Sequence, residues 1–183
     1  MTTRKSTRRS LTLCLSLLAP SLVAGASLGA SDEVGQPAPV LIVKQLDGHD
    51  LDLVALRGKV VVLNFWATWC PPCRAEMPML EAFYEKHATE GVTVIGLSAD
   101  DPHERKAVTR AMLGFTYPAA LLVDAKSNGF GVPKVLPITY IIGADGIIRA
   151  RLLPTKGNLT EQELSAAVAA LLHKDAASLP PGE

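Results

Sequence analysis

The residues best suited to chemistry in this 183-residue chain are two cysteines, Cys70 and Cys73, which flank Pro71 and Pro72. In a helix this spacing places the two side chains on one face, a turn apart. Two thiols held so close can bind a metal ion, close a structural disulfide, or pass electrons to another protein. The rest of the sequence helps to choose among these three kinds of chemistry.

A purely structural disulfide is disfavoured by the short loop that it would close. A disulfide stabilises a fold mainly by restricting the unfolded chain, and the effect grows with loop length. A bond between Cys70 and Cys73 would enclose only two residues. We therefore expect this bond to contribute little to stability.

A zinc site is also disfavoured, because a structural zinc ion needs four ligands. The other soft ligands are scattered along the chain, without a pair at ligand spacing: His49, His87, His103 and His173. Each is expected to be a solvated surface histidine. The sequence therefore predicts no metal, and it predicts no other cofactor.

The first 30 residues have the features of an export leader. Four basic residues precede an apolar run at 11–19, and small residues follow at 24–26, as at a cleavage site. Residues 1–30 are predicted to be a signal peptide or, if they stay attached, a signal anchor, since 11–30 is long enough to span a membrane. An exported domain enters an oxidising compartment, where disulfides persist.

Removal of the leader would change both the charge and the cysteine count. The whole chain has 18 basic and 18 acidic residues, and the leader carries four of the basic ones, so 14 against 18 leaves a net charge of −4. No basic patch remains to indicate a nucleic-acid partner. Cys14 leaves with the leader, and only the pair at 70 and 73 remains.

The elements expected around the pair favour redox chemistry. Residues 60–65 form an apolar, β-branched run typical of a strand buried on both faces, and a helix should run from the cysteines toward His87. Cys70 would then lie at the helix start, where free N–H groups and the helix dipole stabilise a thiolate. Cys70 is the predicted nucleophile, and Cys73 is the predicted resolving thiol.

Three neighbouring residues are expected to tune the redox potential: Trp69, Pro71 and Pro72. The prolines suit the first helical turn, but they offer no N–H to the Cys70 sulfur. A less stabilised thiolate makes the couple more reducing.

The remaining segments alternate between strand and helix patterns. A hairpin is predicted at 40–46 and 50–56, strands at 92–97 and 119–123, and a second hairpin at 138–142 and 147–153, with a glycine-containing connector at 125–132 between them. Capping boxes at 101–104 and 160–163 predict two more helices, the first of which ends at Gly114. This order predicts an α/β sandwich around a mixed sheet, in one domain at 35–173 that is followed by a disordered tail at 174–183.

The active-site stretch has a clear family resemblance. The chain contains LRGKVVVLNFWATWCPPCRAEMPMLEAFY, which resembles the TlpA/ResA-type branch of the thioredoxin superfamily, the exported thiol–disulfide oxidoreductases. The similarity extends from Gly35 to Leu172. It implies a thioredoxin-like fold, in which helices flank a central mixed β-sheet, with an N-terminal β-hairpin and a central insertion.

The same resemblance implies two further site residues. The stretch VLPITYIIGADGIIRARL is similar to the family's second signature, whose proline is cis and faces the disulfide, and that proline would be Pro137. Glu76 shares one helical face with Cys73, and the family has a matching glutamate, so we expect a catalytic role for Glu76. Asn64 occupies the place of a buried aspartate in thioredoxin, and it is expected to be a hydrogen-bonded core amide. The connector departs from the family's helical stretch, because Gly129 and Gly131 weaken a helix.

We expect a monomer. The family resemblance implies that it reduces disulfides in partner proteins, for example apocytochrome c or metal-site assembly factors, and that a membrane thiol-electron transporter reduces it again. A dithiol oxidase and a Cu(I)-binding metallochaperone remain as alternatives. Peroxiredoxins have a threonine three residues before their catalytic cysteine, where this chain has Ala67. The resemblance to peroxiredoxins therefore stops at the fold.

Overall fold

The structure is a computed structural model that describes residues 34–154 and 157–178. The predicted leader at 1–30 and the last five residues, 179–183, lie outside this part of the chain. Within the described part, no helix combines the length and the apolar character that a membrane crossing requires.

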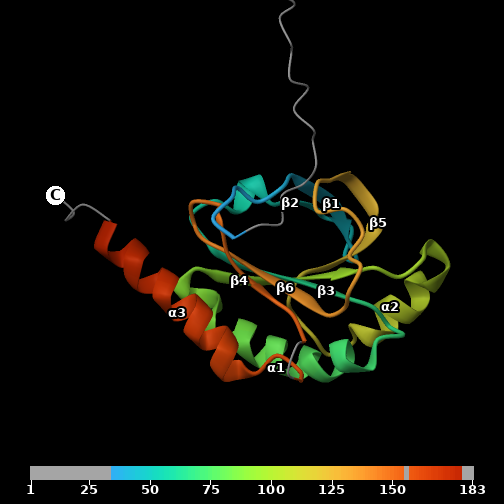
Figure 1. The fold of residues 1–183 in the computed structure, drawn as a ribbon. Helices are drawn as coiled ribbons and strands as arrows, with labels where there is room; N and C mark the ends of the chain where they lie inside the picture. Colours follow the sequence, from blue (N-terminus) through green and yellow to red (C-terminus); the bar gives the residue numbers. More distant parts are fainter. Residues whose placement is uncertain (1–33, 155–156, 179–183) are drawn as a thin grey trace, which may run out of the picture.

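A seven-stranded sheet forms the centre of the molecule, in the order β2-β1-β5-β4-β3-β6-β7 (Figure 1). Its strands are β1 (Leu41–Gln45), β2 (Asp50–Asp52), β3 (Val60–Trp66), β4 (Val92–Ser98), β5 (Ala119–Asn128), β6 (Ile138–Ile142) and β7 (Ile148–Leu152). β3 pairs in parallel with β4 and antiparallel with β6. The predicted mixed sheet is therefore confirmed.

The inner strand β3 has no exposed residue, because both faces of the sheet are covered there. Val62 and Trp66 belong to the hydrophobic cluster on one face, and Leu63 and Phe65 belong to the cluster on the other. Such alternation is the ordinary consequence of strand geometry, in which successive side chains point to opposite faces. β3 ends at Trp66, only four residues before Cys70, so the buried strand carries the first cysteine to the edge of the sheet.

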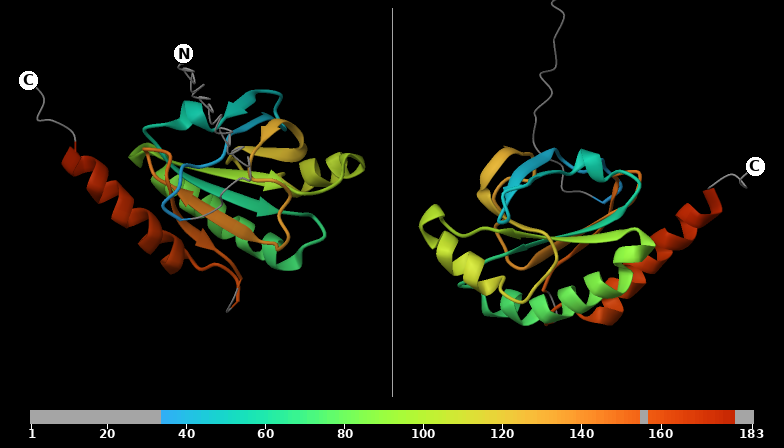
Figure 2. Two further views of the ribbon diagram at one scale, coloured as in Figure 1. Left: turned by 45° about the horizontal axis from the view of Figure 1, so that its top comes forward. Right: turned by 180° about the vertical axis from the view of Figure 1, so that it is seen from behind.

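Three helices complete the fold: α1 (Pro71–His87), α2 (Arg105–Ala111) and α3 (Glu161–Ser178). Figures 1 and 2 show α1 and α3 on one face of the sheet. Met77 and Leu80 of α1 share a hydrophobic cluster with Leu164 and Val168 of α3. The predicted apolar face of the last helix therefore packs into the core.

The opposite face of the sheet is covered by the β1–β2 hairpin. These two strands pair antiparallel around Gly48, whose positive φ of 92° suits glycine. Leu41, Val43 and Leu51 of the hairpin pack in the second cluster with residues of β3 and β6. The hairpin thus takes the place of a helical layer on this face.

β5 is longer than the sequence predicted, because pairing with β1 extends it. The prediction had this strand end at residue 123, with a connector to follow. In the structure its second half continues to Asn128, where Ser127 and Asn128 lie opposite residues of β1. The two glycines that weaken a helix here come after the strand. At Gly129 an added Cβ would lie 2.8 Å from the Cβ of Pro39, so the close approach to this neighbour requires glycine.

The capping box predicted at 101–104 does not form. Residues Pro102–Glu104 make a 3-10 turn instead, in which the Glu104 amide donates to the backbone carbonyl of Asp101. The Asp101 side chain therefore makes no capping hydrogen bond. The helix that follows, α2, ends at Ala111, three residues before Gly114.

The second capping box is present at the start of α3. The Thr160 hydroxyl accepts a hydrogen bond from the Glu163 amide, and the Thr160 amide donates to the Glu163 carboxylate. The helix then continues to Ser178. The helix therefore extends five residues past the predicted domain end at residue 173.

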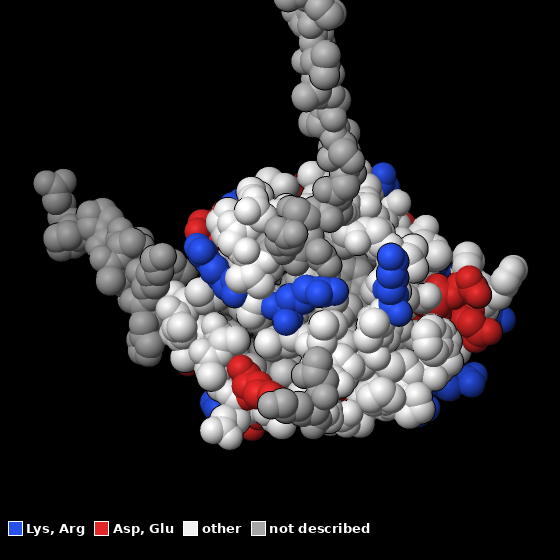
Figure 3. All heavy atoms as spheres, viewed as in Figure 1, with Lys and Arg blue, Asp and Glu red and all other residues white. Residues whose placement is uncertain are grey.

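Charged side chains are unevenly spread over the surface. On the face shown in Figure 3, basic side chains lie across the middle and acidic side chains lie toward the edges. This distribution matters for the cavities described below.

Candidate active site

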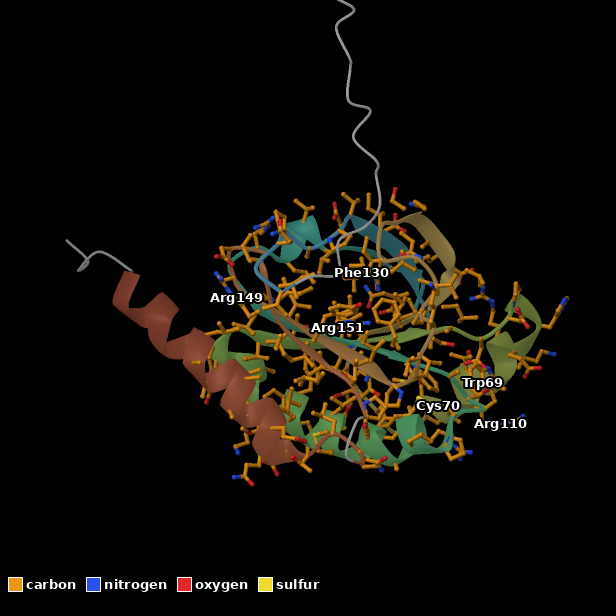
Figure 4. The ribbon with its side chains drawn as sticks, in the orientation of Figure 1. Trp69, Cys70, Arg110, Phe130, Arg149 and Arg151 are labelled. Atoms are coloured by element: carbon orange, nitrogen blue, oxygen red, sulfur yellow. A yellow bond between two sulfur atoms is a disulfide. The ribbon has the colours of Figure 1, made fainter. Side chains whose placement is uncertain are left out.

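Cys70 and Cys73 are joined by a disulfide at the start of α1, with their Cα atoms 5.3 Å apart. Cys70 is the N-cap residue of the helix, as the sequence predicted, and Cys73 lies one turn inside. Figure 4 shows Trp69 and Cys70 at this end of α1. The positive end of the helix dipole therefore points toward the Cys70 sulfur.

One backbone amide still reaches this sulfur despite the two prolines. Pro71 and Pro72 occupy the first two helical positions and have no N–H to donate. The Cys73 amide, at the third position, donates to the Cys70 Sγ over 3.3 Å. Thiolate stabilisation by the helix start is thus reduced to this one donor among the first three positions.

A surface cavity of about 380 Å³ opens beside Cys70, and we call it the thiol cavity. Trp69, Pro71 and Pro72 line it together with Leu136. Trp69 is 65% exposed, whereas Cys70 is only 4% exposed and Cys73 1%. The three residues predicted to tune the redox potential therefore line the cavity through which a partner would reach Cys70.

The Leu136–Pro137 peptide bond is cis, as the family resemblance implied. Leu136 lines the thiol cavity, and Pro137 lines a second cavity of about 330 Å³. Glu76 and Thr139 also line this second cavity, which we call the Glu76 cavity. The cis peptide bond therefore connects the surroundings of Cys70 with those of Glu76.

Glu76 is buried on α1, with 2% of its surface exposed. Its Oε1 accepts a hydrogen bond from the Leu159 amide at 2.7 Å, and its Oε2 has no partner among the described residues. Burial raises the pKa of Glu76, and the negative charge of Glu163 adds to the rise, while the Leu159 hydrogen bond opposes it. A carboxyl group whose pKa is raised in this way is better suited to exchange a proton than a solvated glutamate.

Asn64 has the structural role that the sequence predicted. It is buried in β3, and its side-chain amide donates to the Thr139 hydroxyl on β6 over 2.9 Å. The two residues face each other in the register of the two strands. This hydrogen bond joins β3 to a residue of the Glu76 cavity.

Asp100 is a buried acid that the sequence analysis missed. It lies just after β4, and its carboxylate accepts hydrogen bonds from the amide and the hydroxyl of Thr68 and from the hydroxyl of Ser98. Thr68 lies two residues before Cys70, so Asp100 holds the loop that presents the nucleophile. The signal in the sequence was weak, because Asp100 precedes the exposed Asp101 and both resemble helix-capping residues.

We expect Asp100→Ala to lower the free energy of unfolding by about 2–4 kcal/mol, because it would leave two part-buried donors of Thr68 and the buried Ser98 hydroxyl without this acceptor. Urea unfolding of the oxidised protein measures this change. Asp101→Ala is the matched control, and this exposed neighbour should change stability by less than about 0.5 kcal/mol. An equal loss in both variants would contradict the anchoring role of Asp100.

Glu81 is a second buried acid on α1 that the sequence analysis missed. Its carboxylate accepts hydrogen bonds from the Thr116 amide and hydroxyl and from the Tyr117 amide. Glu81 therefore holds the loop before β5.

Among residues 34–154 and 157–178, no three His, Cys, Asp or Glu side chains group as a metal site.

Comparison with known proteins agrees with this geometry. Residues 34–151 match the model of the AhpC/TSA family. The chain is 35% identical over 133 residues to the thiol–disulfide oxidoreductase ResA of Bacillus thuringiensis, which covers 72% of this chain and 75% of that protein. The chain belongs to the ResA-type thiol–disulfide oxidoreductases of the AhpC/TSA family. The Cys70–Cys73 disulfide lies within the part of the chain that the family model matches.

Solved structures support the same membership. A secreted Mycobacterium tuberculosis disulfide oxidoreductase, described as homologous to Escherichia coli DsbE, has a TM-score of 0.57 and 29% identity, over 71% of this chain and 95% of that one. A secreted thiol–disulfide isomerase from Corynebacterium glutamicum has a TM-score of 0.61 and 25% identity, over 74% and 84% of the two chains. The predicted thioredoxin-like fold is therefore confirmed.

Proposed function

We propose that this ResA-type oxidoreductase reduces disulfides in partner proteins outside the cytoplasm. The observation that carries the proposal is the position of Cys70, which caps α1 and lines an open cavity, whereas Cys73 is buried behind it. A thiolate at a helix start next to an open surface is accessible to a partner disulfide. A second thiol one turn inside is placed to attack the first.

In the first step the Cys70 thiolate attacks one sulfur of the partner's disulfide. A bond forms between Cys70 and that sulfur, and the partner's other sulfur leaves as a thiolate. In the second step Cys73 loses its proton and attacks the Cys70 Sγ. This attack forms the Cys70–Cys73 disulfide and releases the partner's second thiolate, so two electrons have passed from the enzyme to the partner.

Glu76 is the proposed proton acceptor for Cys73. The two residues lie three apart on the buried side of α1, and Glu76 has one carboxylate oxygen without a partner among the described residues. A carboxyl group whose pKa is raised by burial can take up this proton and release it to the Glu76 cavity. Pro137 lines the same cavity, and its proposed role is to shape the surface between Glu76 and the approaching partner.

The location and the partners are part of the same proposal. The leader predicted at 1–30 supports export, and the relatives from M. tuberculosis and C. glutamicum are both described as secreted. Outside the cytoplasm the oxidised enzyme must be reduced again, and a membrane thiol-electron transporter is the proposed donor. Apocytochrome c and metal-site assembly factors are the proposed partners.

The reduction potential tests the direction of electron flow. The helix start gives the Cys70 sulfur a single amide donor, and ionised Glu76 disfavours thiolates, so both features stabilise the oxidised form. We expect a potential near that of thioredoxin, about −270 mV, in equilibrium with a glutathione or dithiothreitol buffer. A value near about −120 mV, typical of a strong oxidant, would instead favour a dithiol oxidase.

A further inference from the structure

A third cavity lies next to the thiol cavity, on the other side of residues 131–135. It measures about 360 Å³, and we call it the aromatic cavity. The two cavities have three lining residues in common: Val132, Pro133 and Lys134. A polypeptide attached to Cys70 would therefore need to cross only this short segment to reach the aromatic cavity.

Three aromatic rings form the wall of this cavity. The ring centroids of Phe130 and Tyr140 are 5.2 Å apart, and Phe65 lies 5.7 Å from Phe130 and 5.9 Å from Tyr140. Phe130 comes from the connector after β5, which departs from the helical stretch of the family resemblance. Phe65 and Tyr140 are only 1% and 4% exposed, so the half-buried Phe130 ring presents the surface against which another apolar side chain can pack. The cavity is therefore suited to an aromatic or large aliphatic side chain.

The charges around the two cavities have one sign. Lys134 lines both cavities, Arg151 lines the aromatic cavity, and no Asp or Glu lines either of them. Phe130 and Arg151 both lie near the middle of the view in Figure 4, and Figure 3, in the same orientation, shows basic side chains across this region. A ligand that carries a carboxylate beside its apolar group would complement this surface.

The segment between the cavities also has free backbone groups. The amides of Val132, Lys134 and Val135 donate no hydrogen bond to another described residue, and the two valine side chains are exposed, Val132 to 76%. An extended peptide can pair with such a backbone in the way that a strand is added to a sheet edge. Exposed apolar side chains beside free amides are typical of a docking surface.

We propose that the aromatic cavity, with Lys134 at its rim, is a docking site for the partner's polypeptide. Its occupant is an extended segment next to the attacked cysteine, which carries an aromatic or large aliphatic side chain followed by an acidic residue. The apolar side chain enters the cavity, and the carboxylate pairs with Lys134. This docking rests on the proposed disulfide reduction, because the partner is held at Cys70 while its flanking segment binds.

The test uses reduced protein and synthetic peptides that each contain one Cys-Ala-Ala-Cys disulfide. Phe-Glu is placed two to five residues from a cysteine, on either side, and each peptide has matched Ala-Glu and Phe-Lys versions. We expect the best Phe-Glu peptide to be reduced about tenfold faster than its Ala-Glu version, because a phenylalanine becomes buried. It should be reduced about three- to fivefold faster than its Phe-Lys version at low salt.

Variants assign these preferences to the two features of the site. Lys134→Glu should reverse the preference for Phe-Glu over Phe-Lys, whereas Lys59→Glu, the same change at the opposite end of β3 from Cys70, should leave it unchanged. Phe130→Ala should abolish the preference for Phe over Ala, with the exposed Leu113→Ala as control. Thermal melting verifies that each variant is folded, and Lys134→Glu tests the site even if Phe130→Ala does not fold.

A small neutral disulfide, 2-hydroxyethyl disulfide, separates this inference from the proposed function. It cannot use the docking site, so the rate of each variant with this compound gives its basal reactivity, and the peptide preferences are expressed relative to that rate. If wild type reduces neither this compound nor the peptides, the proposed reductase function is wrong. If wild type reduces every peptide at the same rate within about twofold, the docking site is wrong while the function stands.

Discussion

Cys70→Ser should abolish disulfide reduction, whereas Cys73→Ser should complete the first step and then stop as a mixed disulfide. The reason is that the two cysteines have different roles: Cys70 lines the thiol cavity and attacks the partner, whereas Cys73 is buried one turn inside α1 and resolves the mixed disulfide. A serine hydroxyl is not ionised at neutral pH, so the loss at Cys70 should be on the order of a thousandfold or more. Single-turnover reduction of a peptide disulfide measures it.

Cys70→Ser and Cys73→Ser are the same chemical change one helical turn apart, so each variant is the control for the other. Cys73→Ser should accumulate one covalent adduct per protein molecule, which mass spectrometry detects and dithiothreitol removes. In cells, the proteins that stay linked to Cys73→Ser through Cys70 would identify the partners. Adducts on Cys70→Ser, through Cys73, would reverse the assignment of nucleophile and resolving thiol.

Glu76→Gln should slow partner reduction by about ten- to a hundredfold, because the amide cannot accept the proton of Cys73. It should also lower the apparent pKa of the thiols, since a nearby carboxylate disfavours a thiolate. Thiolate absorbance against pH and single-turnover rates measure the two effects. We expect the thiols and Glu76 to titrate together, so the apparent pKa values would belong to the group.

The stability of the wild-type protein and that of Glu76→Gln should depend differently on pH. Burial raises the pKa of Glu76, so the folded protein holds this proton more tightly than the unfolded chain. The resulting stabilisation is complete below the ordinary value of 4.5 and is lost as the pH rises through the folded-state pKa. Glu76→Gln stays neutral, so its melting temperature relative to wild type should rise across that window.

Glu85→Gln is the matched control for both measurements, since Glu85 is an exposed glutamate on the same helix. It should keep the wild-type rate, thiol titration and pH dependence. If Glu76→Gln behaves in the same way as this control, Glu76 has no part in the proton transfer. The proposed site would then consist of Cys70, Cys73 and Pro137.

The sequence alone determined the parts of the site that depend on local chemistry. The cysteine spacing, the prolines after Cys70 and the apolar run before it were enough to predict a buried strand that leads into a helix start. The helical periodicity was enough to predict that Glu76 lies on the buried side of the helix, because residues three and four apart share a face. The cis form of Pro137 came only from the family resemblance, because most X–Pro bonds in folded proteins are trans.

Contacts between residues far apart in the chain could not be predicted from local patterns. The partner of Glu76 is the amide of Leu159, 83 positions away, and Asp100 anchors Thr68 across 32 positions. β5 extends past its predicted end because it pairs with β1, and strand formation depends on such neighbours more than on local preference. The aromatic cavity likewise needs Phe65 and Tyr140 beside Phe130. These contacts depend on how strands pair and pack, and a one-dimensional pattern does not contain that information.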